Sequence, residues 1–269
     1  MTPDDFTYIS TLIKSRSGLV LTPDKSYLLE SRLMPVARKH GLKGLDELVG
    51  TLRARKEEAL IVEVTEAMTT NESFFFRDTK PFDLLRDEVL PPILEKRAAK
   101  KTLRIWCAAA SSGQEPYSIA IILKEMAAKL AGWKIDIVGT DISHDILKKA
   151  TAGAYSQFEV QRGMPIQMLL KYFEKKDENW CIKEDIRKMV QYRYWNLLDD
   201  PKPLGNFDIV FCRNVLIYFD AQTKGKVLET IARMMPEDGM LFLGGAETVL
   251  GVTDKFKPVA GQRGVYSHA

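Results

Sequence analysis

The sequence predicts an α/β protein: a doubly wound parallel sheet with a small antiparallel β subdomain, preceded by a small all-α domain. Two patterns predict this architecture. Over residues 4–71, apolar side chains recur every three or four positions, which is typical of amphipathic helices, and no strand-like alternation interrupts them. From residue 103 onward, short apolar runs alternate with helical stretches, the order of a parallel sheet whose strands are joined by helices.

The all-α domain, which we assign to residues 1–75, is built from helices with recognisable ends. Ile9 and Ile13 fall on one face of the first helix. The next helix opens at Thr22, a capping residue that precedes a proline. A polar break at residues 69–73 follows the last helix, so we place the end of the domain close to it.

The second domain, residues 76–269, alternates strands and helices. Two further short strands separated by charged turns predict the antiparallel subdomain, at about 172–195. In chain order we predict main-sheet strands at 103–107, 134–139, 207–212 and 239–243, helices at 118–130, 143–153 and 222–235, and subdomain strands at 180–183 and 189–195.

Composition excludes several classes of function. The 39 basic and 36 acidic residues leave a net charge of +3, too small a field to predict nucleic-acid binding. No apolar run approaches the length of a membrane span, and the N-terminus does not resemble a signal peptide. The cysteines and histidines are scattered, without metal-ligand spacing. We therefore expect a soluble cytoplasmic protein with no bound metal, no nucleic-acid partner and no insertion into the membrane.

The turn after the first strand is made of small residues. Residues 107–116 read Cys-Ala-Ala-Ala-Ser-Ser-Gly-Gln-Glu-Pro, and small side chains let the backbone approach a ligand closely. In a nucleotide-binding βα unit this turn lies beneath the cofactor, at the carboxyl edge of the sheet. Taken alone, the pattern fits tight packing of the strand against the next helix equally well.

Two carboxylates indicate which cofactor such a turn would hold. Asp141 ends the second strand, where an acceptor for two ribose hydroxyls is needed, although it could also simply cap the following helix. Glu115 begins the helix after the turn, where its charge would repel a pyrophosphate. The same charge suits the amino group and sulfonium of S-adenosylmethionine, so the turn favours this methyl donor over a dinucleotide.

A third polar residue, Asn214, follows the apolar strand 207–212 and emerges beside the predicted cofactor. DNA amino-methyltransferases place an Asn or Asp here, followed by Pro-Pro and an aromatic residue. The sequence after Asn214 lacks that signature, which disfavours methylation of nucleic acid.

Four motifs, in the correct order, resemble those of the CheR chemoreceptor methyltransferases. The resemblance extends over nearly the whole chain and implies a Rossmann-like, S-adenosylmethionine-dependent domain that esterifies receptor glutamates for chemotactic adaptation. The motifs are TTNESFFFR at 69–77, AAASSGQEPYS at 108–118, TDI at 140–142 and FCRNVLIYF at 211–219.

The family pattern, carried over position by position, implies a set of site residues. Ser73 stands where some relatives have threonine. Arg77 and Tyr218 are the candidates for steadying the substrate carboxylate. Contacts to S-adenosyl-L-methionine, and to its product S-adenosyl-L-homocysteine, are implied for Asn71, Ser73, Arg77, Glu115, Asp141, Asn196, Leu197, Asn214 and Val215.

The resemblance also implies a partner, the cytoplasmic helical domain of chemoreceptors. Lys25, Arg32 and Lys39 are spaced by seven and would form one basic stripe on a helix, joined by Arg38, that attracts glutamate-rich helices. A solvated helix face is the alternative. The turn at 175–179 is short and lacks glycine, so we expect no tight binding of a receptor C-terminal pentapeptide. We expect a monomer.

A glutamate carboxylate, with a pKa near 4.3, is ionised at neutral pH and needs no general base. Alignment of oxygen, methyl and sulfur then accounts for most of the chemistry. Two alternatives remain: a non-catalytic S-adenosylmethionine-binding signalling module, and a methyltransferase that acts on small metabolites.

Overall fold

The computed structural model describes residues 2–269, which form two compact units. The helical unit runs up to Thr70 and also includes Tyr218–Thr223, whereas the sheet unit comprises Asn71–Ile217 and Lys224–Ala269. The chain therefore passes from one unit to the other three times. The boundary predicted from the sequence lies between residues 75 and 76, and the distant segment carries no local signal that assigns it to the helical unit.

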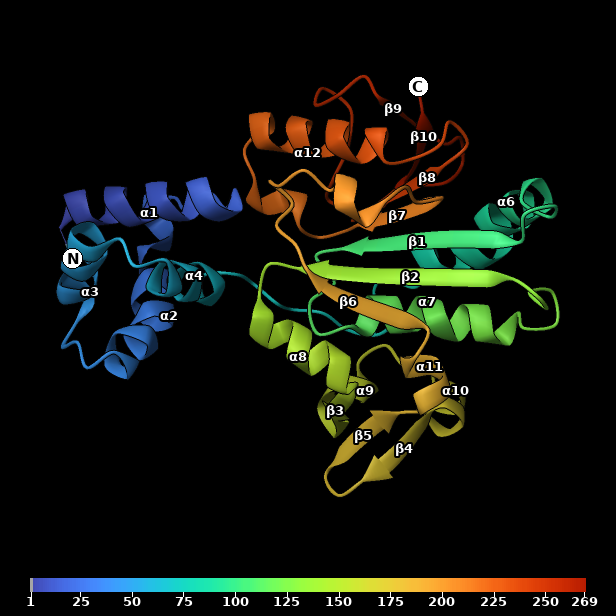
Figure 1. The fold of residues 1–269 in the computed structure, drawn as a ribbon, viewed down its shortest axis with the longest axis horizontal. Coiled ribbons are helices and arrows are strands. Elements are labelled where there is room, and N and C mark those ends of the chain that lie inside the picture. Colours follow the sequence, from blue (N-terminus) through green and yellow to red (C-terminus); the bar gives the residue numbers. More distant parts are fainter. Residues whose placement is uncertain (1) are drawn as a thin grey trace. The chain divides into compact units, whose positions relative to one another are not determined.

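The helical unit contains α1 to α4, packed against one another around an apolar core (Figure 1). Thr2 caps α1 through a capping box with Asp5, and Gly18 ends the helix with a φ of 78°. Pro23 opens a single 3₁₀ turn before α2. The helices are α1 (Pro3–Ser17), α2 (Ser26–Lys39), α3 (Leu45–Arg55) and α4 (Glu58–Ala67).

The segment Tyr218–Thr223 is an integral part of the helical unit. Leu19 forms an isolated antiparallel bridge with Phe219, and the Val20 N–H donates to the Tyr218 carbonyl over 2.9 Å. A Cβ at Gly18 would lie 3.2 Å from the Phe219 ring. Glycine therefore serves both the left-handed turn and the close approach of the distant segment.

The sheet unit is built on seven strands in the order β6-β2-β1-β7-β8-β10-β9 (Figure 1). The first five are parallel, whereas β10 and β9 pair antiparallel. This confirms the predicted doubly wound sheet. The strands are β1 (Thr102–Ala108), β2 (Lys134–Asp141), β6 (Val190–Tyr194), β7 (Ile209–Cys212), β8 (Met240–Leu243), β9 (Phe256–Pro258) and β10 (Val265–His268).

Helices connect most of the successive parallel strands, as the alternating sequence pattern predicted, whereas the connection from β6 to β7 carries a 3₁₀ turn at Lys202–Leu204. Helix α7 lies between β1 and β2 in the chain, α8 follows β2, and α12 lies between β7 and β8. The helices of this unit include α5 (Lys80–Leu84), α6 (Leu90–Lys96), α7 (Gln114–Glu125) and α8 (His144–Ala152); α12 spans Ala221–Arg233 and begins in the segment that belongs to the helical unit.

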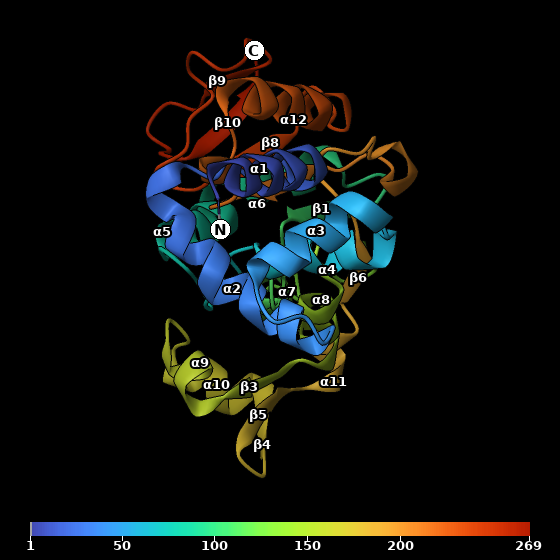
Figure 2. The same ribbon diagram turned by 90° about the vertical axis from the view of Figure 1, so that its left-hand side faces the viewer.

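The antiparallel subdomain is a three-stranded sheet in the order β3-β5-β4 (Figure 2). We predicted that residues 189–195 belong to it, and this is wrong: they form β6, which pairs parallel with β2 at the edge of the main sheet. Alternating burial identifies a half-exposed strand but does not reveal its partner. The subdomain contains β3 (Ala154–Ser156), α9 (Gln157–Gln161), α10 (Ile166–Tyr172), β4 (Phe173–Lys176) and β5 (Asn179–Ile182), with α11 (Glu184–Arg187) leading into β6.

The aromatic run at 74–76 anchors the start of the sheet unit. Phe75 is fully buried, with its ring edge-on to Tyr155 at 5.0 Å. Phe76 packs edge-on against Phe82 at 5.4 Å. Such pairs add to the free energy gained from burial, so the polar residues on either side of the run, from Asn71 to Arg77, are held against this unit.

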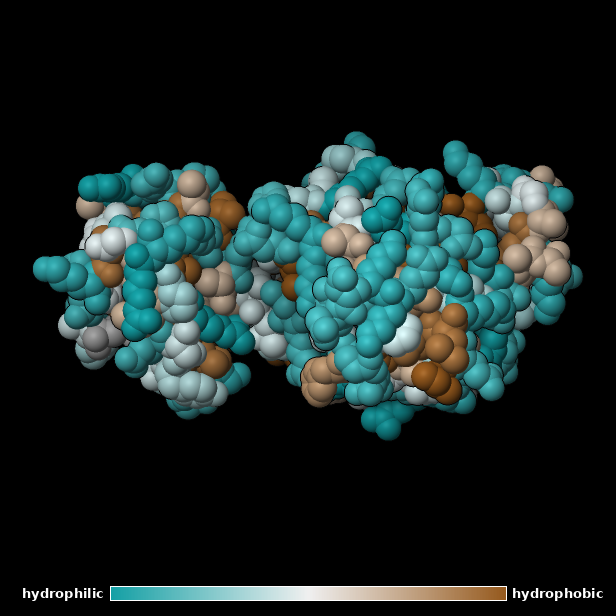
Figure 3. Space-filling view, turned by 90° about the horizontal axis from the view of Figure 1, so that it is seen from below, coloured by the Kyte–Doolittle hydropathy of each residue, from teal (hydrophilic) through white to brown (hydrophobic). Residues whose placement is uncertain are grey.

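Hydrophilic residues cover most of the surface seen in Figure 3, and hydrophobic residues gather there only in small areas. Among the described helices, none combines the length and the apolarity needed to cross a membrane.

Candidate functional site

The turn after β1 has an unusual backbone. Ala109 and Ser111 have φ values of 61° and 51°, and Gly113 has 92°. Left-handed conformations at non-glycine residues cost about 1–3 kcal/mol each and persist where the surroundings enforce them. Here the Ala110 N–H donates to the Thr140 carbonyl over 2.8 Å, which ties the turn to the end of β2.

Asp141 is the last residue of β2 and is 6% exposed. Its carboxylate accepts the Ser111 N–H over 2.9 Å and the Ser143 N–H over 3.1 Å. Asp141 therefore shapes the turn after β1 from the carboxyl end of β2, the sheet edge at which parallel α/β folds bind ligands.

Glu115 lies in the first turn of α7 and forms a buried ion pair that the sequence analysis missed. The Arg213 guanidinium donates to Glu115 Oε2 over 2.8 Å, to Asp78 Oδ2 over 2.7 Å and to the Arg77 carbonyl over 3.0 Å. The Arg213 side chain is only 1% exposed. Burial raises the pKa of the Glu115 carboxyl, and the Arg213 charge offsets part of that rise.

The only sequence signal for Arg213 is its position, directly after the wholly apolar strand β7 and before Asn214. A charged residue at such a point must find partners, because an unpaired buried charge is strongly destabilising. The sequence does not reveal those partners, since Glu115 and Asp78 lie 98 and 135 positions away.

The linker residues are fixed against the sheet unit. Ser111 Oγ donates to the Asn71 carbonyl over 2.9 Å, and the Phe76 N–H donates to Ser118 Oγ over 2.9 Å. The Arg77 guanidinium donates to the Glu72 carbonyl over 3.0 Å and lies 5.3 Å from the centre of the Phe74 ring. Half-buried Ser73 lies between them in the chain. The structure thus brings Asn71 and Arg77 to the turn after β1 and to Arg213.

The remaining cofactor candidates follow β6 and β7. The Trp195 N–H donates to the Asp141 carbonyl over 3.0 Å, which places the following Asn196 and Leu197 beside the end of β2. Asn214 and Val215 come directly after Arg213 at the end of β7. Because β6, β2, β1 and β7 are parallel neighbours, their carboxyl ends form one edge of the sheet. All the predicted cofactor residues from the strand ends therefore lie on that edge.

Tyr218 is placed differently. It belongs to the helical unit, where its carbonyl accepts the Val20 N–H and its side chain packs against the helical core. Its proposed contact with a substrate carboxylate remains a prediction.

The basic stripe is only partly continuous. Lys25 lies in the 3₁₀ turn before α2, so the helical spacing does not extend to it. Lys39 pairs with Glu63 at 2.7 Å. Arg32 donates to the Met68 carbonyl over 2.7 Å, and to Thr69 and Thr70. Of the residues we proposed for receptor binding, Lys25, Arg38 and Lys39 are exposed and Arg32 is half-buried.

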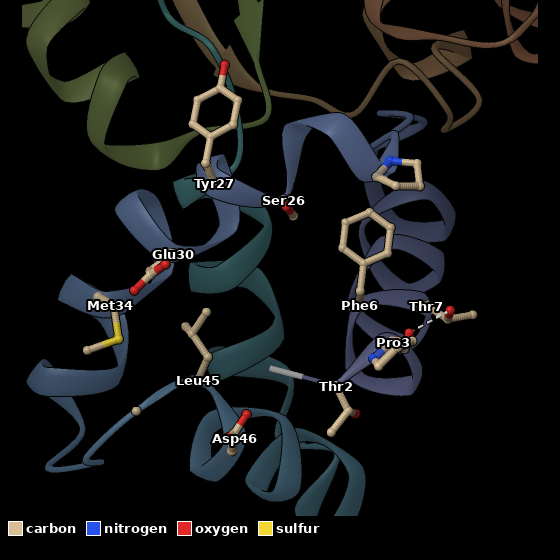
Figure 4. A pocket seen from close by; sticks show the side chains of 12 residues that line it. Thr2, Pro3, Phe6, Thr7, Ser26, Tyr27, Glu30, Met34, Leu45 and Asp46 are labelled. Atoms are coloured by element: carbon tan, nitrogen blue, oxygen red, sulfur yellow. Dashed lines mark hydrogen bonds between the residues drawn. The ribbon is translucent and has the colours of Figure 1, made fainter.

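A separate groove of about 850 Å³ lies within the helical unit between α1, α2 and the start of α3 (Figure 4). Phe6, Met34 and Leu45 supply its apolar lining, and Glu30 and Asp46 supply carboxylates. Among the described residues that line it, none is Lys or Arg. The groove is therefore unsuited to a glutamate-rich segment, and it contains none of the predicted cofactor residues.

The edge of the sheet has the features that S-adenosylmethionine requires. A Cβ at Gly113 would lie 2.5 Å from Tyr192 Oη, so only glycine fits in the turn. Asp141 places carboxylate oxygens at the end of β2, and Glu115, whose side chain is 12% exposed, pairs with the buried Arg213 guanidinium. Within residues 2–269, no group of three or more His, Cys, Asp or Glu side chains is arranged to hold a metal ion.

Comparison with known proteins agrees with this description. Residues 71–265 match the family described as CheR methyltransferase, SAM binding domain, and residues 4–69 match CheR methyltransferase, all-alpha domain. Chemotaxis protein methyltransferase Cher2 of Pseudomonas putida is 39% identical over 269 residues, which cover 98% of each chain. Chemotaxis protein methyltransferase 1 of Vibrio cholerae is 40% identical over 256 residues, 94% of this chain and 92% of its own. The chain therefore belongs to the CheR family of S-adenosylmethionine-dependent methyltransferases.

Proposed function

We propose that the protein transfers the methyl group of S-adenosyl-L-methionine to glutamate side chains of chemoreceptors, which yields glutamate methyl esters and S-adenosyl-L-homocysteine. The observation that carries the proposal is the pair of carboxylates at one sheet edge: Asp141 is buried and the Glu115 side chain is 12% exposed. The names of the relatives, chemotaxis protein methyltransferases, support the receptor as substrate.

The electrostatics of Glu115 favour a cationic ligand. Removal of a carboxylate from water disfavours its charged form, which is why burial raises the Glu115 pKa. Arg213 offsets this in part, and Arg77 adds a smaller favourable contribution. The amino group and sulfonium of the donor would add further positive charge. We propose that Glu115 holds the methionine end, Asp141 the ribose, and Asn196, Leu197, Asn214 and Val215 the adenine side.

The proposed reaction requires little acid–base catalysis by the protein. When bound, the donor supplies a methyl group that its sulfonium already activates. A glutamate carboxylate is ionised at neutral pH, so it attacks without a general base. Precise alignment of the reacting atoms is worth up to about 7–11 kcal/mol. We propose that Arg77, fixed through Glu72 and Phe74, steadies the incoming carboxylate together with Tyr218.

We propose that the helical unit recognises the cytoplasmic helical domain of the receptor through Arg38 and Lys39, with Lys25 and Arg32 alongside. The β4–β5 hairpin turns through Asp177 and Glu178 alone. This short turn supports our expectation that no receptor C-terminal pentapeptide binds tightly. We further propose that the protein acts as a monomer.

The test is methyl transfer from radiolabelled S-adenosylmethionine to receptor-containing membranes, with base-labile methyl ester as the readout. Label that appears in the receptor and is released by mild base supports the proposal. Donor binding without transfer would instead favour a non-catalytic signalling module. Transfer to small acids but not to receptor would favour a metabolite methyltransferase.

Arg77→Ala tests the assigned role in the same assay. We expect turnover to fall at least about tenfold, since a charge-assisted bond contributes about 1.5–3 kcal/mol. The variant should remain folded, with only a small fall in the unfolding midpoint, because the side chain gives up its bond to the Glu72 carbonyl. Arg86→Ala is the matched control, because Arg86 is exposed and pairs with nearby Asp83 and Asp87. Normal turnover by Arg77→Ala with purified receptor would remove Arg77 from the mechanism.

A further inference from the structure

Glu247, in the loop after β8, binds four backbone N–H groups with one carboxylate. Its Oε2 accepts from Asn214 over 2.8 Å and from Gly244 over 2.6 Å. Its Oε1 accepts from Val215 over 2.9 Å and from Ile217 over 3.3 Å. The residue is 9% exposed, so these bonds are largely shielded from water. Each oxygen thus serves two donors.

These bonds determine the path of the chain after β7. Asn214 has a φ of 59°, a conformation that needs support from its surroundings in a residue other than glycine. The N–H groups of Asn214, Val215 and Ile217 have left the β7 ladder, and backbone N–H groups away from water require partners. An ionised carboxylate supplies strong acceptors for all of them.

Gly244 allows the two loops to approach each other. A Cβ at this position would lie 2.7 Å from both Asn214 Nδ2 and Glu247 Oε2, and 3.0 Å from the Asn214 nitrogen. Any larger residue would therefore displace the Asn214 carboxamide or the carboxylate. Gly244 and Glu247 together fix both the backbone and the side chain of Asn214.

We propose that Glu247 is a positioning residue for the cofactor pocket: its carboxylate holds Asn214 and Val215 in the conformation that receives the adenine side of S-adenosylmethionine. This rests on the proposed function, which assigns Asn214 and Val215 to the cofactor. Glu247 acts through them and touches no reacting atom.

The geometry predicts that only a carboxylate on a side chain as long as that of glutamate can accept hydrogen bonds from both loops. In Glu247→Gln, the amide NH₂ would face two backbone N–H donors in place of an oxygen that accepts from both. In Glu247→Asp, the carboxylate is one methylene shorter and loses reach to one of the loops. Neither conservative variant should restore the wild-type pocket.

The experiment measures the affinity of the full chain for S-adenosyl-L-homocysteine by calorimetry, alongside thermal unfolding. We expect Glu247→Gln to bind about ten- to a hundredfold more weakly, equivalent to loss of one or two buried hydrogen bonds. The matched control is Asp208→Asn. Like Glu247, Asp208 accepts a backbone N–H with its carboxylate, that of Arg104 over 2.8 Å. Asp208 precedes β7, however, so it lies at the end of that strand opposite to Asn214.

The control separates positioning from general stability. Asp208→Asn should unfold at lower temperature yet bind the ligand within about twofold of wild type, a change of under about 0.5 kcal/mol. If Glu247→Gln is folded and binds like wild type, or if both variants lose affinity equally, the positioning role is overturned.

Gly244→Ala keeps the inference testable should Glu247→Gln fail to fold. It retains the carboxylate but crowds Asn214, and we expect a similar loss of affinity with a smaller loss of stability. Undiminished affinity in folded Gly244→Ala would count against the proposal. Failure of the wild-type chain to bind S-adenosyl-L-homocysteine would overturn the proposed function itself. Equal binding by the wild type and the variants would instead overturn only the positioning role of Glu247.

Discussion

The Glu115–Arg213 ion pair allows the structural role and the proposed ligand-binding role of Glu115 to be tested in one variant. Loss of the Glu115 charge would leave Arg213 with Asp78 and the Arg77 carbonyl, so the guanidinium would remain partly compensated. We expect Glu115→Gln to lower the free energy of unfolding by about 1–3 kcal/mol and to weaken binding of S-adenosylmethionine at least about tenfold. Urea unfolding and calorimetry measure the two effects.

Glu88→Gln is the control for this substitution, because Glu88 is exposed. Glu88→Gln should change neither the free energy of unfolding nor the affinity for S-adenosylmethionine. Unaltered ligand affinity in Glu115→Gln would show that Glu115 has only a structural role.

A second ion pair predicts a pH dependence. The two terminal guanidinium nitrogens of Arg97, Nη1 and Nη2, donate to Asp238 over 2.8 and 2.7 Å, and this lowers the pKa of Asp238 from 3.8 to about 2. Because the folded-state pKa is depressed, the stabilisation is fully present above pH 3.8 and is lost as the pH falls through about 2. We expect Asp238→Asn to be less stable than wild type by about 2 kcal/mol at pH 7.

That difference should shrink as the pH is lowered from 4 towards 2, in urea unfolding at each pH. Asp254→Asn, at an exposed position, should show no such dependence. A gap between Asp238→Asn and wild type that stays constant with pH would contradict the assigned cause.

At the scale of single residues, the sequence was sufficient to place those at the ends of predicted strands and the starts of predicted helices. Asp141 and Glu115 lie at a strand end and a helix start, and parallel topology brings such ends to one edge. Arg213 and Glu247 contact partners far away in the chain, such as Glu115 and Asn214, so local patterns do not reveal those partners. Their discovery required the three-dimensional structure.

At the scale of elements, Arg32 connects α2 to the end of α4. Its guanidinium donates to the Met68 and Thr69 carbonyls and to Thr70 Oγ1. A cation at a helix C-terminus is favourable, and the planar fork reaches several acceptors at once. We expect Arg32→Lys to lower the stability of the helical unit by about 1–2 kcal/mol, since lysine keeps the charge but not the fork.

Arg38→Lys, at an exposed position of the same helix, is the control and should be neutral in the same urea titration. Equal stability of both variants would mean that the Arg32 bonds contribute nothing measurable. Receptor affinity is better tested by charge reversal at Arg38 and Lys39, because a change at Arg32 combines binding with stability.

The strands and crossover helices of the main sheet followed from periodicity, because buried parallel strands are short apolar runs. The pairing of β6 with β2 could not be predicted in this way, because the alternating pattern of β6 suits an edge strand of either sheet. The strands β3 and β9 span three residues each, too few for periodicity to detect.

At the scale of the whole molecule, the helical unit depends on a second part of the chain. A fragment that ends at Thr70 would lack Phe219, which covers Gly18, and the carbonyl that binds the Val20 N–H. We expect this fragment to unfold at lower urea concentration than the helical unit does in the full chain. The Val20 amide, protected in the full chain, should exchange with solvent at least about tenfold faster, consistent with loss of one hydrogen bond.

Hydrogen exchange followed by NMR measures this directly. The Ile9 amide, inside α1, provides an internal reference, and its exchange should change less than that of Val20. Equal protection of Val20 in the fragment and the full chain would show that Tyr218–Thr223 is dispensable.

The two-part construction of the helical unit limits how it can be exchanged between relatives. A chimaera that takes only about the first seventy residues from a relative would combine the relative's helices with the Tyr218–Thr223 segment of this chain. The relative's residue at position 19 would then have to form its bridge with Phe219 of this chain. A faithful graft therefore needs two inserts. The second must be spliced between Ile217, whose N–H is bound by Glu247, and Lys224, inside α12.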